Sequence, residues 1–381
     1  MTYSSIAQKY DYFRHPLIEL EVGGVSIAGG KRLISVSNVT VDLTAGFEAS
    51  QAMFSLYNCY DYEEGSFDFD IVKKFVLLGS PVRILLGYDK TVTEVFRGII
   101  TRVNFLIEEE DVPNIQVTAM DVKAVMMSSC YSKKLKAKNY YNAVKEIFEQ
   151  SIYKGLEEDK VITDYVIDET PDYTPGDSPE ETDHTIEMVA ESDYEFLVKI
   201  AKKYNYDFFV LGGIVYFRKA KKDTEKQITI DSKAKIKRLS VEYDVTGLVE
   251  KVEVRGLDVG KAKMISQTKK NTNKISQGSK AKSLLSGKEY VYIDTAAASA
   301  GDAGKRAEYL MEDIMYRYGT MELDIIGIPE ILPGRFITLS GVGTAVSNDF
   351  YVQSVRHTLN AEGEYSTRVI GKTNKQGSSL L

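Results

Sequence analysis

The sequence predicts an α+β protein rich in β-strands, with two similar small β-barrel domains flanking a mixed α/β middle domain. Strand-like alternation of apolar and polar residues fills both ends of the chain, helical periodicity is concentrated in the middle, and one order of strands and glycine turns occurs twice. The 381 residues, 43% hydrophobic and 27% charged, suffice for two or three domains. We place a first barrel at 1–122, the middle domain at 123–227, a second barrel at 228–371 and a flexible tail at 372–381.

The first region contains short apolar or alternating runs separated by turn residues. The expected strands are Leu17–Val22, Arg32–Leu43, Pro81–Tyr88, Val95–Ile107 and Asn114–Met120. The glycines between the first two strands invite a phosphate-loop interpretation, but GGVSIAGGK lacks the GxxxxGK[ST] spacing and does not lead into a helix. We therefore assign a hairpin to these residues, which are Gly23, Gly24, Gly29 and Gly30.

The middle region combines helices with a hairpin. Apolar periodicity predicts a helix over Asn139–Tyr153. Ser192 followed three residues later by Glu195 has the pattern of a capping box, which predicts the start of a second helix. Gly212 and Gly213 separate the apolar runs DFFVL and IVYFR, and such a pair is typical of a two-residue β-hairpin.

The last region alternates again from Ile228 onward. It contains a predicted helix over 302–318, with Gly319 as its C-terminal stop. The runs MELDIIG, RFITLSG, FYVQSVRHTL and YSTRVIGK are expected to be strands.

Two segments are expected to be exposed. Residues 168–185 are acidic and rich in proline, and they contain His184, which we expect to be solvated. Residues 261–288 are rich in Lys and Ser and predict a mobile insertion in the second barrel domain. The alternative for this insertion is an arm that becomes ordered when it docks on a partner.

The two strand-rich regions share one order of elements. The first region has three runs in the order GSPVRILLGY, VFRGIITRVNF and NIQVTAMD. The last region has similar runs in the same order, which are GRFITLSG, NDFYVQSVRHTL and YSTRVIG. In this alignment Gly79 corresponds to Gly334, and Gly87 to Gly341. We therefore expect a duplicated module, and unrelated strand orders in the two regions would contradict this hypothesis.

Few side chains are available for catalysis or metal binding. The chain has no CxxC motif, and its three histidines are far apart: they are His15, His184 and His357. The two cysteines, Cys59 and Cys130, are predicted to be free thiols. Zinc sites and histidine-dependent triads are therefore disfavoured. We assign no catalytic, cofactor-binding or metal-binding residue.

One acidic cluster offers a hydrolytic alternative; its residues are Glu191, Ser192, Asp193 and Glu195. A pair of carboxyl groups across a cleft could cleave a glycoside. Helix capping accounts for the same residues without a further assumption, and we favour it. His357 has no nearby nucleophile or acid in the sequence, so we interpret it as a half-buried or interface histidine.

Three stretches resemble one protein family. ESDYEFLVKIAKKYNYDFFVLGGIVYFRK is similar to a segment of the phage late-control D proteins and of the related hub portion of VgrG spikes. LPGRFITLSGVG, followed by NDFYVQSVRHTLNAEGEYSTRVIG, resembles the end of that family, and SPVRILLGYDKTVTEVFRGIITRV resembles its N-terminal stretch. The stretches occur in the family's order and span most of the chain.

The resemblance implies a structural protein without enzymatic activity: the baseplate hub of a contractile phage tail or of a phage-tail-like particle, such as an R-type bacteriocin or an injection system. It implies a homotrimer whose two tube-like barrels form a pseudo-hexameric ring, and hence a symmetry adaptor between the sixfold tail tube and a threefold spike. Expected partners are a trimeric tail spike protein, the tail tube protein, a tape-measure protein and other baseplate proteins. The chain ends after the second barrel, so the spike is expected on a separate polypeptide.

Charge and hydropathy complete the expectations. A net charge of −7 argues against specific nucleic-acid binding. The absence of a long apolar run predicts no membrane insertion and no secretion signal, so synthesis and assembly in a bacterial cytoplasm are expected, with release as part of the particle. We expect no cofactor. The alternatives are a tail-tip cell-wall hydrolase and a host-binding adhesin.

Overall fold

A computed structural model describes residues 1–27, 34–109, 111–173, 185–258, 262–273, 280, 283–295, 297 and 299–377. Gly29, Gly30 and His184 lie outside these ranges, as do parts of the segments 168–185, 261–288 and 372–381. Across the described ranges the chain is rich in β-structure, with seven α-helices and 23 strands. The expected α+β class is therefore confirmed.

The first β-module contains six principal strands in the order β3-β4-β9-β8-β7-β1. Their bounds are β1 (Pro16–Val22), β3 (Ser35–Thr44), β4 (Gln51–Tyr57), β7 (Pro81–Tyr88), β8 (Thr91–Leu106) and β9 (Asn114–Met120). Shorter elements accompany them: α1 (Tyr3–Lys9), a 3₁₀ turn (Asp11–Phe13), β2 (Val25–Ser26), β5 (Tyr60–Asp61), β6 (Ser66–Phe67) and α2 (Phe69–Phe75). Alternating burial along β3 follows its alternating sequence, so one face of this sheet points to the core.

The second β-module repeats this order as β16-β20-β23-β22-β21-β15. Its strands are β15 (Lys226–Ile230), β16 (Ile236–Tyr243), β20 (Gly319–Ile326), β21 (Phe336–Leu339), β22 (Asp349–Leu359) and β23 (Tyr365–Thr373). Matching neighbours are antiparallel in both modules, except that β15 is parallel to β21 whereas β1 is antiparallel to β7. The shared strand order supports the duplication hypothesis.

Local geometry matches as well. The β8–β9 ladder skips Thr101, and the β22–β23 ladder skips Gln353. Gly79 and Gly334 both have φ +83°. The amide of Gly79 donates to the carbonyl of Ile100 at 2.8 Å, and that of Gly334 donates to the carbonyl of Val352 at 2.9 Å. These glycines are equivalent, because each makes the same left-handed turn into the same ladder.

The second glycine pair of the alignment is not equivalent. Gly87 lies inside β7, where an added Cβ would come within 2.0 Å of the Thr91 carbonyl oxygen. Gly341 follows the end of β21 and has φ +69°. The sequence match therefore holds at the start of these two strands and fails at their ends.

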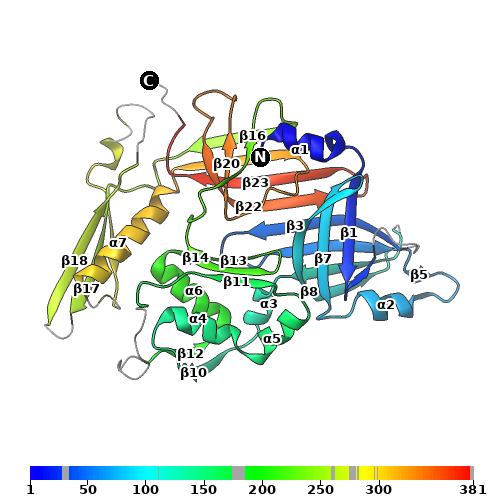
Figure 1. The fold of residues 1–381 in the computed structure, drawn as a ribbon, viewed down its shortest axis with the longest axis horizontal. Helices are drawn as coiled ribbons and strands as arrows, with labels where there is room; N and C mark the ends of the chain where they lie inside the picture. Colours follow the sequence, from blue (N-terminus) through cyan, green and yellow to red (C-terminus); the bar gives the residue numbers. More distant parts are fainter. Residues whose placement is uncertain are drawn as a thin grey trace.

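The two modules share one sheet and one core. β3 pairs with β22, so a 13-stranded sheet runs through both modules (Figure 1). Buried apolar residues from both modules form a single cluster. No ladder among the described strands closes either module into a barrel, so the two closed barrels expected from the sequence are not confirmed. The reason is local: part of the edge of β22 is occupied by β3 of the other module.

The middle region packs below this sheet in Figure 1 and has its own core. Its helices are α3 (Lys123–Met126), α4 (Tyr140–Phe148), α5 (Ser151–Glu158) and α6 (Asp193–Tyr204). Its strands are β10 (Tyr131–Lys134), β11 (Asp164–Ile167), β12 (Glu187–Glu191), β13 (Tyr206–Leu211) and β14 (Ile214–Lys219). The capping box at Ser192 and the β13–β14 hairpin at Gly212 and Gly213 are confirmed. The helix expected over Asn139–Tyr153 is instead two helices, because Gln150 is extended with ψ 146°.

A third unit projects from the second β-module at the left of Figure 1, and we call it the arm. It contains β17 (Lys251–Asp258), β18 (Lys263–Lys270), β19 (Glu289–Ile293), a 3₁₀ turn (Ser283–Leu285) and α7 (Ala300–Met315). The helix expected over 302–318 is thus present with shifted ends. The segment 261–288, expected to be a mobile insertion, contains β18, all of which pairs with β17. The polar composition of β18 hides this strand, because only Ile265 is buried.

Candidate functional site

The acidic cluster at the start of α6 is used for structure. The Ser192 hydroxyl accepts a hydrogen bond from the Glu195 amide at 3.1 Å, and the Glu195 carboxylate accepts one from the Ser192 amide at 2.8 Å. Glu191 forms an ion pair with Lys199 at 2.6 Å. These contacts engage both glutamates, as expected for a helix start.

Asp193 lies deeper than the rest of this cluster and is 3% exposed. Its carboxylate accepts hydrogen bonds from the hydroxyls of Tyr131 and Tyr153, the latter at 2.6 Å, and from Gln150 at 3.2 Å. Burial raises the pKa of Tyr131 to about 12, and the hydrogen bond to Asp193 adds to the increase. Asp193 thus ties β10 and α5 to α6, and the contacts do not form a pair of carboxyl groups across a cleft.

His357 is fully buried on β22. Its Nδ1 lies 3.0 Å from the hydroxyl oxygens of both Thr367 and Tyr365. Burial lowers the pKa of His357 to about 4, so the ring is neutral near pH 7. This histidine is a core residue and not the half-buried one expected from the sequence.

The described residues contain no cluster of three or more His, Cys, Asp or Glu side chains suited to a metal ion. Cys59 is buried and Cys130 is exposed, and both are free thiols, as expected. No helix in the described ranges is long and apolar enough to cross a bilayer.

A cavity of about 560 Å³ lies between the middle region, the arm and both β-modules. Its two carboxylates are engaged: Asp207 accepts a hydrogen bond from Tyr351 at 2.6 Å, and Asp313 pairs with Arg317 at 2.8 Å. No histidine or cysteine is among its lining residues. The lining therefore lacks the serine–histidine and cysteine–histidine pairs of the common hydrolases.

The joint between the two β-modules is a continuous strand pairing. β3 and β22 pair over six residues, from Ser354 opposite Thr44 to Leu359 opposite Val39. Val39, Val41 and Leu43 on β3 are all buried in the shared core. On the opposite face Asp42 forms an ion pair with Arg356 at 2.5 Å. Backbone pairing thus fixes the register of one module against the other.

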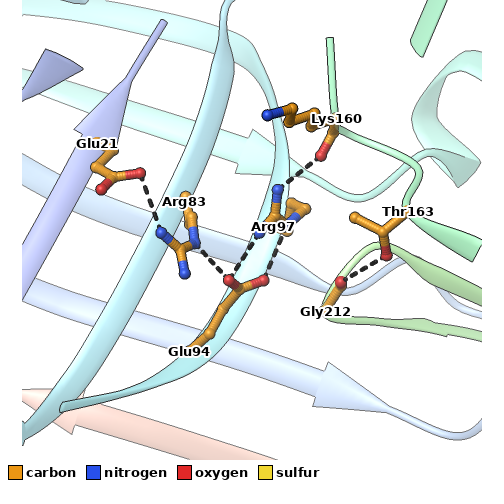
Figure 2. A network of polar contacts seen from close by, with 7 residues as sticks. All are labelled: Glu21, Arg83, Glu94, Arg97, Lys160, Thr163 and Gly212. Carbon is orange, nitrogen blue, oxygen red and sulfur yellow. Dashed lines mark hydrogen bonds and ion pairs between the residues drawn. The ribbon is translucent and has the colours of Figure 1, made fainter. Parts of the chain in front are cut away.

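A network of polar side chains joins the first β-module to the middle region (Figure 2). Arg97 on β8 donates to the Glu94 carboxylate at 2.8 and 2.9 Å and to the carbonyl oxygen of Lys160 at 2.8 Å. Arg83 forms an ion pair with the same Glu94 carboxylate. An added Cβ on Gly213 would lie 2.8 Å from the Cδ of Arg97, so this hairpin turn requires a glycine beneath the network.

Lys123 makes a second, buried contact between the same units. Its Nζ donates to the backbone carbonyls of Gly46, Phe47 and Glu48 at 3.1, 3.2 and 2.8 Å. The same nitrogen lies 5.0 Å from the centre of the Phe208 ring. Burial lowers the pKa of Lys123 to about 8. The sequence analysis missed this residue, although its position in the apolar run Val122–Met127 was a signal that could have pointed to burial.

Two apolar surfaces are exposed at opposite ends of the long axis in Figure 1. The tip surface lies around α2 and contains Tyr62, Phe69, Leu77 and Leu78. The arm surface lies on the arm sheet and contains Leu257, Met264, Val291 and Ile293. Exposed apolar groups gathered in this way are typical of contacts with other proteins.

Comparison with known families gives one match. A family model described as the Alg8 N-terminal domain matches residues 30–361. No curated protein matches the sequence.

Solved structures match most of the chain at low sequence identity. A tail protein from Neisseria meningitidis MC58 aligns with a TM-score of 0.66 and 12% identity, covering 94% of this chain and 97% of that one. A 43 kDa tail protein of prophage MuSo2 from Shewanella oneidensis aligns with a TM-score of 0.64 and 11% identity, covering 94% and 98%. A type VI secretion component of E. coli, described as structurally similar to the T4 tail proteins gp27 and gp5, gives 0.55 and 10%, covering 92% and 76%. This chain therefore has the fold of these proteins.

Proposed function

The chain belongs to the family described as the Alg8 N-terminal domain. From its fold, which it shares with tail proteins, we propose that it is the structural baseplate hub of a contractile phage tail or of a phage-tail-like particle. In this role it trimerises into a pseudo-hexameric ring and connects a sixfold tail tube to a threefold spike. The late-control D and VgrG-like resemblance of the sequence is part of the proposal.

The observation that carries the proposal is the repeated module. Two modules with one strand order, one bulge position and one glycine turn lie edge to edge in a single sheet. Three such chains around a threefold axis present six similar modules to a neighbour. A sixfold tube can then contact six similar surfaces while a trimeric spike contacts three identical chains.

The division of the chain belongs to the same proposal. We take residues 1–122 and 228–371 as the two tube-like domains. We take residues 123–227 as the middle domain, which widens the contact with neighbouring chains. Polar contacts from Arg97 and Lys123 to carbonyl oxygens across the first boundary support a fixed arrangement.

The exposed apolar surfaces suit the expected partners. The tip surface and the arm surface each hold four large apolar side chains that are exposed in the single chain. We assign them to contacts with other tail components, among them the tube protein, the spike and the tape-measure protein. Each carboxylate of the former glycosidase candidate is engaged in a structural contact, which supports a non-enzymatic role.

The test is assembly with candidate partners. The full chain is purified, its mass is measured by light scattering with and without candidate spike and tube proteins, and the complex is imaged by electron microscopy. We expect a trimeric ring that binds the spike on one side and the tube on the other. Clearing of peptidoglycan by the isolated chain would instead support a cell-wall hydrolase, and binding of the isolated chain to host cells would support an adhesin.

A further inference from the structure

One edge of β22 is fully covered inside the chain, and its counterpart on β8 is not. β21 covers the first part of this edge, at residues 349–351, and β3 covers the second part, at residues 354–359. In the first module, β7 pairs with β8 only as far as Ile99. Beyond Ile99 no described strand pairs with this edge of β8, so Arg102–Leu106 is a free strand segment.

Equivalent residues on the two strands differ in burial for this reason. Counting from the shared bulge equates Phe105 with His357 and Ile107 with Leu359. His357 is 0% exposed and Leu359 is 9% exposed, whereas Phe105 is 45% exposed and Ile107 is 61% exposed. Phe105 has an aromatic neighbour, Phe67, with ring centres 5.1 Å apart. Among its described residues, the first module therefore has no strand that covers these positions as β3 covers them in the second.

β16 is the counterpart of β3 and is also incomplete. Val41 on β3 faces Ala52 on β4, and Val241 on β16 faces Met321 on β20, at matching places in the two ladders. β3 has a partner strand on both edges, but among the described strands β16 pairs only with β20. Val41 is accordingly buried, and Val241 is only half-buried.

We propose that β16 of one copy of this chain pairs antiparallel with the free edge of β8 in the next copy, in the register that β3 uses on β22. This inference rests on the proposed ring, and it adds the contact that would build that ring. The sheet would then continue from copy to copy. The expected pairs are Arg102 with Asp244, Asn104 with Glu242, and Phe105 with Val241.

The chemistry of these pairs is compatible with contact. Phe105 and Val241 are apolar positions on the core side of their strands, and pairing them removes apolar surface from water. Arg102 and Asp244 carry opposite charges, and Arg102 forms no ion pair with another described residue. Asn104 and Glu242 are at the positions equivalent to Arg356 and Asp42, which form an ion pair in the internal joint. The proposed joint would therefore have another polar pair at this place.

A second copy is the occupant that the molecule itself indicates. The internal joint shows that a strand of the β3 type fits an edge of the β22 type, with one register and a buried apolar row. β16 is the counterpart of β3, and β8 is the counterpart of β22. Among the described strands, each of these two counterparts has an edge, or part of one, without a partner strand. Since they lie on different modules, the contact between copies is head-to-tail, and such contacts close into rings when the rotation permits.

Cysteine cross-linking tests the register. In a Cys130→Ser background, chains carrying Asn104→Cys are mixed with chains carrying Glu242→Cys and oxidised under assembling conditions. We expect a disulfide between chains, formed about tenfold faster than with Ser240→Cys as the second partner, because diagonal positions two residues away are too distant for a disulfide. A chain carrying both Asp42→Cys and Arg356→Cys is the positive control, since this pair is opposite within one chain.

A substitution at the edge tests its energetic role. Phe105→Asp should weaken self-association at least about tenfold, because it places a carboxylate against an apolar strand. Val189→Asp, at an exposed position of the middle region, should leave association unchanged. The melting temperatures of both variants confirm that each chain is folded.

The outcomes separate this pairing from the hub assignment. A trimer that cross-links at the out-of-register pair, or at neither pair, would overturn the strand pairing and leave the hub role standing. Unchanged association of the Phe105→Asp variant would also overturn the pairing. A chain that stays monomeric in the presence of spike and tube proteins would overturn both.

Discussion

Two joints hold the first β-module in place, and they are built differently. At the joint with the second module, the backbones of β3 and β22 pair directly and cover a row of buried apolar side chains. At the joint with the middle region, side chains reach backbone carbonyls across the boundary, as Arg97 does to Lys160 and Lys123 does to Gly46. The first joint depends on strand register, and the second depends on a few individual side chains.

This difference determines which changes each joint tolerates and how rigid it is. A backbone ladder tolerates most changes on its exposed face, but any change of register moves every buried residue to the wrong face. A joint made by long polar side chains can lose one of them and adjust locally. We therefore expect the two β-modules to behave as one rigid body, and the middle region to be the more easily loosened part.

The largest expected effect is at the centre of the inter-module joint. Val41→Asp should lower the free energy of unfolding by more than about 4 kcal/mol, because the new carboxylate would be buried in the apolar shared core. Urea denaturation measures the change. Thr40→Asp, on the opposite face of β3, is the matched control and should stay within about 0.5 kcal/mol. Equal effects of the two variants would show that the joint is not a buried ladder.

The next effect is at the side-chain joint. Lys123→Met should cost about 3 kcal/mol, because it leaves buried carbonyls and the buried Asp121 carboxylate without their cationic neighbour. Chemical denaturation followed by tyrosine fluorescence measures the loss. Lys134→Met, at an exposed position of β10, should change little. If Lys123→Met left the free energy of unfolding unchanged, water would be satisfying these carbonyls. Lys123 would then contribute less to the joint than its burial implies.

A pH effect distinguishes the joints further. The pKa of His357 is lowered by burial from 6.5 to about 4, so its contribution to stability is present above pH 6.5 and is lost as the pH falls toward 4. Between pH 7 and pH 4.5 the wild-type chain should lose about 2 kcal/mol more than His357→Gln, which keeps hydrogen-bonding capacity without a titrating ring. Parallel urea titrations at the two pH values measure this difference. If both proteins lost the same free energy of unfolding between the two pH values, His357 would not be the acid-sensitive group of the inter-module joint.

The sequence predicted the parts of the fold that depend on local patterns. The capping box at Ser192 and the glycine pair at Gly212 and Gly213 specify their elements within a few residues, and both formed as expected. The repeated strand order was visible because glycine turns and alternating runs occurred in the same order twice. β18 was missed, because its neighbours supply the burial that its own polar sequence does not signal.

Long-range contacts were beyond sequence reasoning. Nothing local distinguishes β3, which has partners on both edges, from β16, which has one. The same limit applies to Lys123 and to His357, whose burial depends on segments remote in the chain. The free edge of β8 had one visible signal, the apolar run Phe105–Leu106–Ile107 at a strand end, but its meaning required the comparison with β22.

The smallest effect compares one arginine from each joint. Arg97→Ala should cost about 1 kcal/mol, because its side chain is 17% exposed and loses hydrogen bonds to both Glu94 and the Lys160 carbonyl. Arg356→Ala should cost less than about 0.5 kcal/mol, since its pair with Asp42 is solvent-exposed and the β3–β22 ladder remains. Denaturation at low and high salt measures both. If Arg356→Ala were the more damaging variant, surface charge would hold the two modules together, and the contrast between a backbone joint and a side-chain joint would be wrong.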